Sequence, residues 1–241
     1  MIKNKQTISL AIALSLVALV LSVYASIGAY KINNEETFNE KVEVSIDAYV
    51  AKKQAEVDQA QNPTPTEPVE VSMDDDAVKG DDDAPITMIE FSDFECPFCG
   101  RYFRDTLSQI QEKYIDTGKI KYVFRDYPLG FHQYALSAAI AAECVRAEGG
   151  DDAYYTYHDT LFANQTAIDS DSLKSYASDM GYDIADCLDS EEYADEVQND
   201  FDAGYSYGVR GTPAFFINGR FISGAQPYAS FESVIEEELA K

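Results

Sequence analysis

The sequence lacks tryptophan, has few histidines and cysteines, and is poor in positive charge. Its 241 residues include 2 His, 4 Cys and 18 Lys+Arg against 43 Asp+Glu, a net charge of −25. Such an acidic surface repels phosphate backbones and excludes nucleic-acid binding through a basic footprint. Four cysteines are too few for a miniprotein held together by disulfides. The 46% content of hydrophobic residues predicts an ordinary globular core.

A long uncharged run occupies the N-terminus. Residues 8–30 contain no charge and follow Lys3 and Lys5. As a helix this run is about 34 Å long, enough to cross a hydrocarbon core of about 30 Å. We favour an uncleaved signal anchor, a transmembrane helix at residues 1–30. A signal peptide cleaved near Ala25 and a buried soluble helix are the alternatives.

The charges that flank this run predict its orientation. Residues 31–85 carry 5 Lys and 15 Asp+Glu, so the positive-inside rule leaves the N-terminus in the cytoplasm and exports the remainder. The first cysteine is Cys96, and no cysteine for a lipid anchor follows the run. We therefore expect a single-pass protein of the cell membrane whose folded domain lies outside the cytoplasm.

An acidic linker follows the anchor. We predict a stalk and linker at residues 31–70 and a folded domain at residues 71–241, with a proline-rich spacer near residues 62–68. The acidic triplets at 74–76 and 81–83 lack the ligand spacing, central glycine and distal glutamate of a calcium loop. We interpret them as solvated linker and predict no metal site.

Two cysteines stand at the junction of a predicted strand and a predicted helix. Residues 86–91 are apolar and β-prone, Cys96 and Cys99 follow, and a helical pattern runs through residues 103–114. Strand, CxxC and helix in this order are typical of a redox motif. The helix N-terminus favours a thiolate on Cys96, which we expect to be the exposed, attacking sulfur. Half a zinc site and a purely structural pair are the alternatives.

A second motif lies near the C-terminus. Residues 209–219 predict a loop, a strand and an Asn-Gly hairpin turn, and a closing helix follows at residues 230–239. Pro213 stands immediately before the strand. A proline at this point is able to adopt a cis bond and to leave a backbone edge open for a peptide.

Together the two motifs resemble the DsbA family of thiol:disulfide oxidoreductases, and in particular its membrane-tethered branch in Gram-positive bacteria. The resemblance covers roughly residues 70–241. It implies an α/β thioredoxin fold interrupted by an α-helical insertion at about residues 130–205. It also implies a nucleophilic Cys96, a resolving Cys99 and a cis-proline beside them at Pro213.

The resemblance implies a further role for Glu90, six residues before Cys96. A carboxyl buried in an apolar strand has a raised pKa and is able to exchange a proton with Cys99. Strand alternation alone leaves an outward-facing Glu90 equally open.

One departure from the DsbA pattern is Phe98, where the best-known members carry histidine. Phenylalanine offers neither a donor nor a charge, and Asp93 and Glu95 oppose a further negative charge. We therefore predict a less acidic Cys96 and a weaker oxidant than the histidine-containing enzymes. Substrate contacts are predicted for Pro97, Phe98 and Thr212, while His132 and His158 are assigned to no site.

The other two cysteines, Cys144 and Cys187, are predicted to form a structural disulfide within the helical insertion, because an exported domain with an even number of cysteines favours pairing. Two buried free thiols are the alternative.

The predicted function is disulfide formation in exported cysteine-containing proteins, without a cofactor. By resemblance, a quinone-linked membrane partner reoxidises the cysteine pair. A disulfide reductase or isomerase of the same fold is one alternative. The other is a tethered peptide-binding or chaperone module with structural cysteines.

Overall fold

The computed structural model describes residues 65 and 67–241. The predicted anchor and most of the predicted stalk and linker, including residues 62–64 and 66 of the proline-rich spacer, lie outside these residues. Among the residues described, no helix combines the length and the apolar character that a membrane crossing requires.

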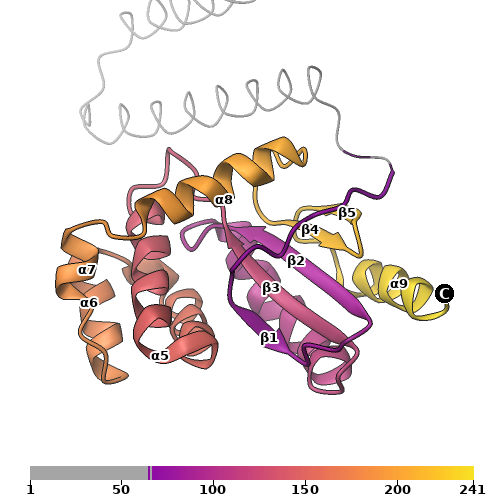
Figure 1. The fold of residues 1–241 in the computed structure, drawn as a ribbon, viewed down its shortest axis with the longest axis horizontal. Coiled ribbons are helices and arrows are strands. Elements are labelled where there is room, and N and C mark those ends of the chain that lie inside the picture. Colours follow the sequence, from indigo (N-terminus) through magenta and orange to yellow (C-terminus); the bar gives the residue numbers. More distant parts are fainter. Residues whose placement is uncertain (1–64, 66) are drawn as a thin grey trace, which may run out of the picture. The chain divides into compact units, whose positions relative to one another are not determined.

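A five-stranded sheet forms the centre of this domain, with the strand order β1-β3-β2-β4-β5 (Figure 1). β2 and β3 are parallel, whereas the other neighbouring strands are antiparallel. Because parallel neighbours need a crossover, a helical segment connects β2 to β3. The strands are β1 (Val78–Gly80), β2 (Ile86–Ser92), β3 (Ile120–Asp126), β4 (Ala214–Ile217) and β5 (Arg220–Ser223).

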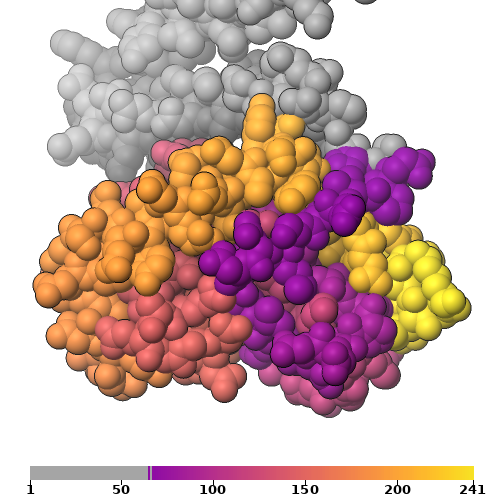
Figure 2. All heavy atoms as spheres, viewed as in Figure 1, coloured from indigo at the N-terminus to yellow at the C-terminus, as the bar shows by residue number. Residues whose placement is uncertain are grey.

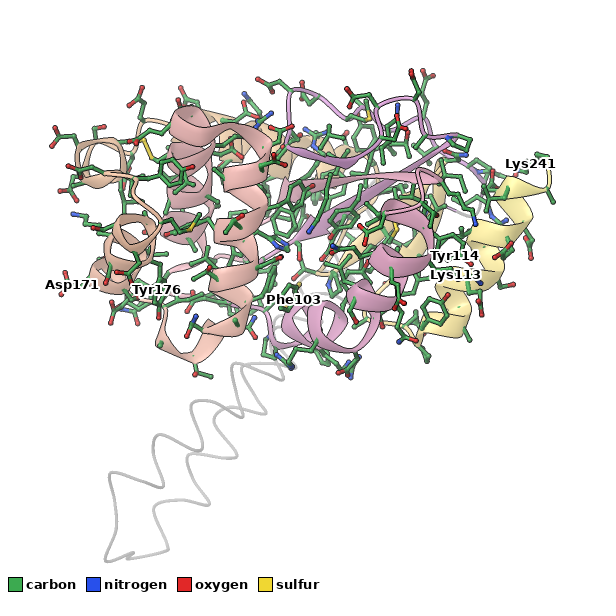
Figure 3. The ribbon with its side chains drawn as sticks, turned by 90° about the horizontal axis from the view of Figure 1, so that it is seen from below. Phe103, Lys113, Tyr114, Asp171, Tyr176 and Lys241 are labelled. Atoms are coloured by element: carbon green, nitrogen blue, oxygen red, sulfur yellow. A yellow bond between two sulfur atoms is a disulfide. The ribbon has the colours of Figure 1, made fainter. Side chains whose placement is uncertain are left out.

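The crossover segment and the C-terminal helix lie side by side. The crossover runs through α3 (Pro97–Tyr102), a π-helical turn (Phe103–Leu107), α4 (Ser108–Ile110) and a second π-helical turn (Gln111–Ile115), and the last helix is α9 (Tyr228–Leu239). Figure 3 labels Lys113 and Tyr114 where the crossover faces α9. Lys113 Nζ lies 2.6 Å from Glu232, and the Tyr114 hydroxyl donates to Glu236 at 2.6 Å.

Alternation along β2 divides its side chains between two cores. Met88 points into the core beneath α3 and α9, whereas Ile89 and Phe91 point into a smaller core on the opposite face. The smaller core is covered by residues 69–73 and by α8 (Ala194–Ser206), as Figure 2 shows from the outside. Gly204 permits this close approach, because a Cβ there would lie 2.8 Å from the Phe91 ring.

Helices occupy the chain between β3 and β4, in agreement with the predicted α/β fold and helical insertion. They are α5 (Ala135–Ala163), a 3-10 turn (Gln165–Ala167), α6 (Ser170–Asp179), α7 (Ala185–Asp189) and α8. α5 is kinked at Gly150, whose φ is 74°. In the structure, Cys144 of α5 and Cys187 of α7 are joined by a disulfide, with their Cα atoms 6.1 Å apart.

The acidic segment before β2 differs from its prediction as a solvated linker. It contains β1, and Asp76 is only 6% exposed. The reason is Arg125 on β3, which is fully buried and needs counter-charges. Its guanidinium pairs with Asp74 at 3.1 Å, with Asp76 at 2.9 Å and with Asp200 of α8.

Candidate active site

Cys96 caps the N-terminus of α3. Its backbone is extended (φ −69°, ψ 120°), and Pro97 begins the helix, where a missing N–H costs no hydrogen bond. The Gly100 N–H donates to the Cys96 carbonyl at 3.1 Å. The same carbonyl accepts a hydrogen bond at 2.8 Å from Gln165 of the helical insertion. The insertion therefore helps to hold the active-site segment in place.

Both cysteines of the motif are thiols in the structure, and both are buried. Cys96 is 3% exposed and Cys99 is fully buried, whereas Phe98 between them is 55% exposed. The prediction of an exposed Cys96 is therefore wrong for this conformation. The loop before β4 lies against the sulfur, since the Cys96 thiol is 3.5 Å from the Thr212 carbonyl.

The two thiols have opposite shifts in pKa. A hydrogen bond from the Cys99 thiol, assisted by Thr212 and by the backbone of Phe98 and Cys99, lowers the pKa of Cys96 to about 6. Burial raises the pKa of Cys99 well above its ordinary value, and the charges of Cys96 and Glu90 raise it further. Cys96 is therefore the sulfur that carries negative charge near neutral pH.

Glu90 lies on β2 and is 2% exposed, so the buried orientation is the correct one. Its parity with Met88 places it on the face that α3 covers. The Tyr122 hydroxyl donates to its carboxylate. Burial raises the pKa of Glu90 to about 8, so that the carboxyl is mostly protonated at neutral pH.

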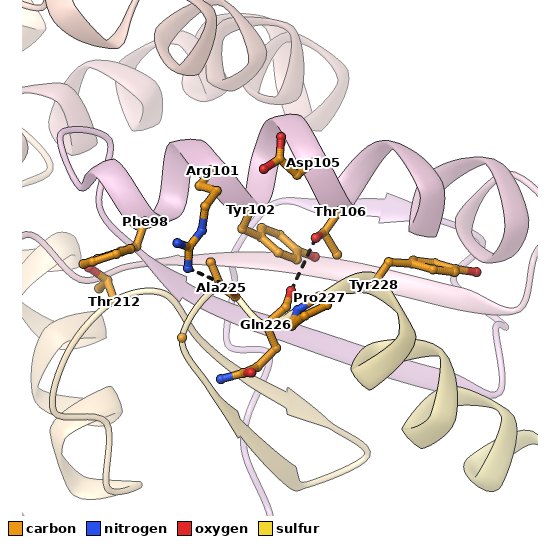
Figure 4. A pocket seen from close by; sticks show the side chains of 11 residues that line it. Phe98, Arg101, Tyr102, Asp105, Thr106, Thr212, Ala225, Gln226, Pro227 and Tyr228 are labelled. Carbon is orange, nitrogen blue, oxygen red and sulfur yellow. Dashed lines mark hydrogen bonds between the residues drawn. The ribbon is translucent and has the colours of Figure 1, made fainter.

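The Thr212–Pro213 peptide bond is cis. It lies at one end of an open groove of about 770 Å³ between the crossover helix and the β5–α9 loop (Figure 4). Arg101 donates to the Ala225 carbonyl at 3.0 Å and ties the loop to α3. The groove is lined by Phe98, Arg101, Tyr102, Asp105, Thr106, Thr212, Gly224, Ala225, Gln226, Pro227 and Tyr228.

Asp93 and Glu95, which were expected to oppose the thiolate, are both hydrogen-bonded. Asp93 accepts the N–H groups of Glu95 and Leu129, each at 2.8 Å, and Glu95 accepts the N–H of Tyr134. His132 Nδ1 also lies 2.7 Å from Asp93. The contact of His132 with Asp93 has no signal in the sequence, because no local spacing marks a contact between residues 39 positions apart.

His158 lies away from these groups, in a buried aromatic cluster. It is 1% exposed, and its ring meets those of Phe94, Phe103 and Phe124. Figure 3 labels Phe103, on the crossover segment. His158 is therefore a packing residue of this cluster.

The fold and the site identify the class of protein. The chain belongs to the thioredoxin family, whose family profile, described as thioredoxin, matches residues 72–237. Within it, the described domain is a DsbA-like member, homologous to the thiol:disulfide oxidoreductases BdbD and DsbA.

Particular relatives support this assignment. Disulfide bond formation protein D of Bacillus subtilis is 31% identical over 172 residues, which are 67% of this chain and 76% of that protein. The crystal structure of oxidised BdbD from Bacillus subtilis matches with a TM-score of 0.66 and 29% identity, over 72% of this chain and 98% of that one. For α-DsbA1 of Wolbachia pipientis the TM-score is 0.60 at 26% identity, over 69% and 92% of the two chains.

A second group of relatives is much longer. The Na⁺/H⁺ antiporter NhaA 3 of Salinispora tropica is 36% identical over 156 residues, which are 63% of this chain but 23% of that protein. The chain thus spans about a quarter of the length of the antiporters that it matches.

Proposed function

We propose that the described domain is an extracytoplasmic thiol:disulfide oxidoreductase that forms disulfides in exported proteins. The observation that carries this proposal is the opposite shift of two neighbouring thiols, with the pKa of Cys96 lowered to about 6 and that of Cys99 raised. A stabilised thiolate favours the reduced form of the pair, and this makes its disulfide oxidising. The same observation favours an oxidase over the reductase or isomerase alternative.

The reaction begins with the Cys96–Cys99 disulfide. A substrate thiolate attacks the Cys96 sulfur, the bond between the two cysteines breaks, and a mixed disulfide forms while Cys99 leaves with the electron pair. A second substrate thiolate then attacks the substrate sulfur of the mixed disulfide and releases Cys96 as a thiolate. Two electrons have passed from the substrate dithiol to the cysteine pair.

Glu90 supplies a proton in the first step. Cys99 leaves into a buried environment where its thiolate is strongly disfavoured. The carboxyl of Glu90, with its pKa of about 8, still holds a proton at neutral pH and raises the pKa of Cys99 when ionised. Transfer of that proton to Cys99 neutralises the leaving thiolate without exposing it to water.

Substrate docks in the groove beside the motif. Phe98 offers an exposed ring there, and the Thr212 carbonyl contacts the Cys96 sulfur. Pro97, the residue after Cys96, is exposed and available to substrate. An extended peptide that places its cysteine at Cys96 would run past the cis Thr212–Pro213 bond.

The proposed setting is the outer face of the membrane, with residues 8–30 as the anchor. The disulfide between Cys144 and Cys187 supports an oxidising compartment. A quinone-linked membrane oxidase is the proposed partner that restores the Cys96–Cys99 disulfide.

Two assays on the full chain in detergent test the proposal. The oxidised protein should restore activity to reduced ribonuclease faster than the Cys96→Ser variant does. The dithiol form, kept reduced by dithiothreitol, should be a poor reductant of insulin. Rapid insulin reduction with no ribonuclease reoxidation would assign the opposite direction. Failure in both assays would leave the binding module as the better description.

A further inference from the structure

The loop that opens the helical insertion, residues 129–134, is tied to the segment before Cys96. Asp93 forms the link: its carboxylate contacts His132 Nδ1 at 2.7 Å and accepts the Leu129 N–H at 2.8 Å. Its own carbonyl accepts the Cys96 N–H at 3.0 Å. The loop and the proposed nucleophile are therefore held by one buried residue.

The charges that act on His132 come from the segment before α3. Asp93, Glu95 and Cys96 are the groups that act on it, and each raises the pKa of His132, with the hydrogen bond that His132 donates to Asp93 as the largest cause. The carboxylates of Asp93 and Glu95 are already hydrogen-bonded to backbone N–H groups. The Phe131 ring packs against the imidazole with its centroid 4.6 Å away.

An interaction between two titrating groups is reciprocal. The negative charge of Cys96 raises the pKa of His132, so protonated His132 must favour the thiolate of Cys96 by the same free energy. The side chain of His132 is only 18% exposed, which limits screening of this interaction by water and salt.

We propose that His132 is a positioning residue of the active site, held by Asp93 so that its imidazolium stabilises the Cys96 thiolate from outside the CxxC motif. Phe98 within the motif carries no charge, and the loop at residues 129–134 supplies one instead. The inference deepens the proposed function and rests on it for its biological meaning. The stabilisation itself is measurable without any substrate.

The first experiment compares two substitutions in the full-length reduced protein. His132→Asn keeps a donor toward Asp93 but removes the charge, whereas His132→Lys keeps a cation. We expect His132→Asn to raise the pKa of Cys96 by half a unit to one unit, so that the thiolate fraction at about pH 5 falls roughly three- to tenfold. The far-ultraviolet absorbance of the thiolate and the rate of alkylation report this change. In His132→Lys, which keeps a cation, the pKa of Cys96 should stay close to that of the parent.

The second experiment needs no change at His132 and covers the case in which the variants do not fold. Nuclear magnetic resonance follows the titration of His132 in the reduced protein, in the oxidised protein and in Cys96→Ser. The pKa of His132 should be highest in the reduced protein, the only one of the three that carries the thiolate. His158, buried in its aromatic cluster, is the internal control and should not change.

Three results would overturn the proposal. The first is an unchanged pKa of Cys96 in folded His132→Asn. The second is an equal shift in the pKa of Cys96 in His132→Asn and His132→Lys. The third is a pKa of His132 that is the same in the reduced protein, the oxidised protein and Cys96→Ser. Each is independent of the ribonuclease and insulin assays, so a failure here is distinguishable from a failure of the proposed function.

Discussion

The two cysteine pairs of this domain show how position decides the chemistry of a thiol. Cys96 and Cys99 lie on one turn at the start of α3, where hydrogen bonds lower the pKa of Cys96 and burial raises the pKa of Cys99. Cys144 and Cys187 are 43 positions apart and join α5 to α7. The first pair has a helix N-terminus, a buried carboxyl and an adjacent groove, whereas the second is placed to cross-link two helices.

The surroundings of the second pair are apolar. Cys144 lies on a stretch of α5 that buries the alanines at 138, 139, 141 and 142. These small side chains permit the close helix approach that the disulfide needs. This difference between a reactive and a structural pair leads to four predictions.

The largest effect is expected at the motif itself. Cys96→Ser should abolish exchange because it removes the reacting sulfur. In Cys99→Ser, the Cys96 thiolate should attack a substrate disulfide and accumulate the mixed disulfide, because no Cys99 thiol is present to resolve it. Non-reducing gel electrophoresis after incubation with a disulfide-bonded substrate measures the adducts. Adducts on Cys96→Ser and none on Cys99→Ser would reverse the proposed roles.

The next largest effect is a difference between the two disulfides in how easily they are reduced. Under a mild reductant in native conditions, thiol counting should find two reactive groups, those of Cys96 and Cys99, and four only after denaturation. The Cys144–Cys187 bond closes a large loop in a packed region, and this favours resistance to reduction. Four thiols in the native protein would remove the distinction between the two pairs.

Removal of the structural bond should affect stability and leave the chemistry intact. For a closed loop of 43 residues, Cys144→Ala with Cys187→Ala should lower the free energy of unfolding by about 4 kcal/mol on the chain-entropy model. Urea unfolding at equal protein concentration measures this, with the single variant Cys144→Ala as a control. A double variant that is as stable as the parent but unable to exchange thiols would contradict the division of roles.

These features differ in how far the sequence alone could predict them. The CxxC helix and the Asn218-Gly219 turn depend on neighbours within a few residues, so local pattern predicts them. The helical insertion was implied by the resemblance to the DsbA family. The burial of Cys96 was missed because it depends on Thr212, 116 positions away.

The buried charges were missed for the same reason. Arg125 meets Asp200, 75 positions later, and Asp93 meets Leu129, 36 positions later. The acidic composition predicts a solvated linker, because the sequence near residue 76 gives no sign of the buried Arg125 guanidinium on β3. Contacts of this kind arise only when the insertion folds back on the sheet.

The smallest of the four effects concerns Glu90, which acts on only one of the two pairs. Its pKa is about 8 in the folded protein against an ordinary value of 4.5. Between these values the folded protein binds the extra proton, so stability falls as pH rises from about 4.5 to about 8. Glu90→Gln removes this loss, so the variant should gain roughly 3–4 kcal/mol on the parent between about pH 5 and pH 8.

The pH dependence of stability in the parent and in Glu90→Gln is best compared in the oxidised protein, in which neither cysteine of the motif titrates. Exposed Glu112→Gln serves as the matched control and should follow the parent at every pH. Slower exchange by Glu90→Gln near neutral pH should accompany the stability change, because the amide has no proton to give to Cys99. Parallel stability profiles for the parent and Glu90→Gln would mean that the carboxyl is ionised in the fold, and the proton-transfer step would then need another donor.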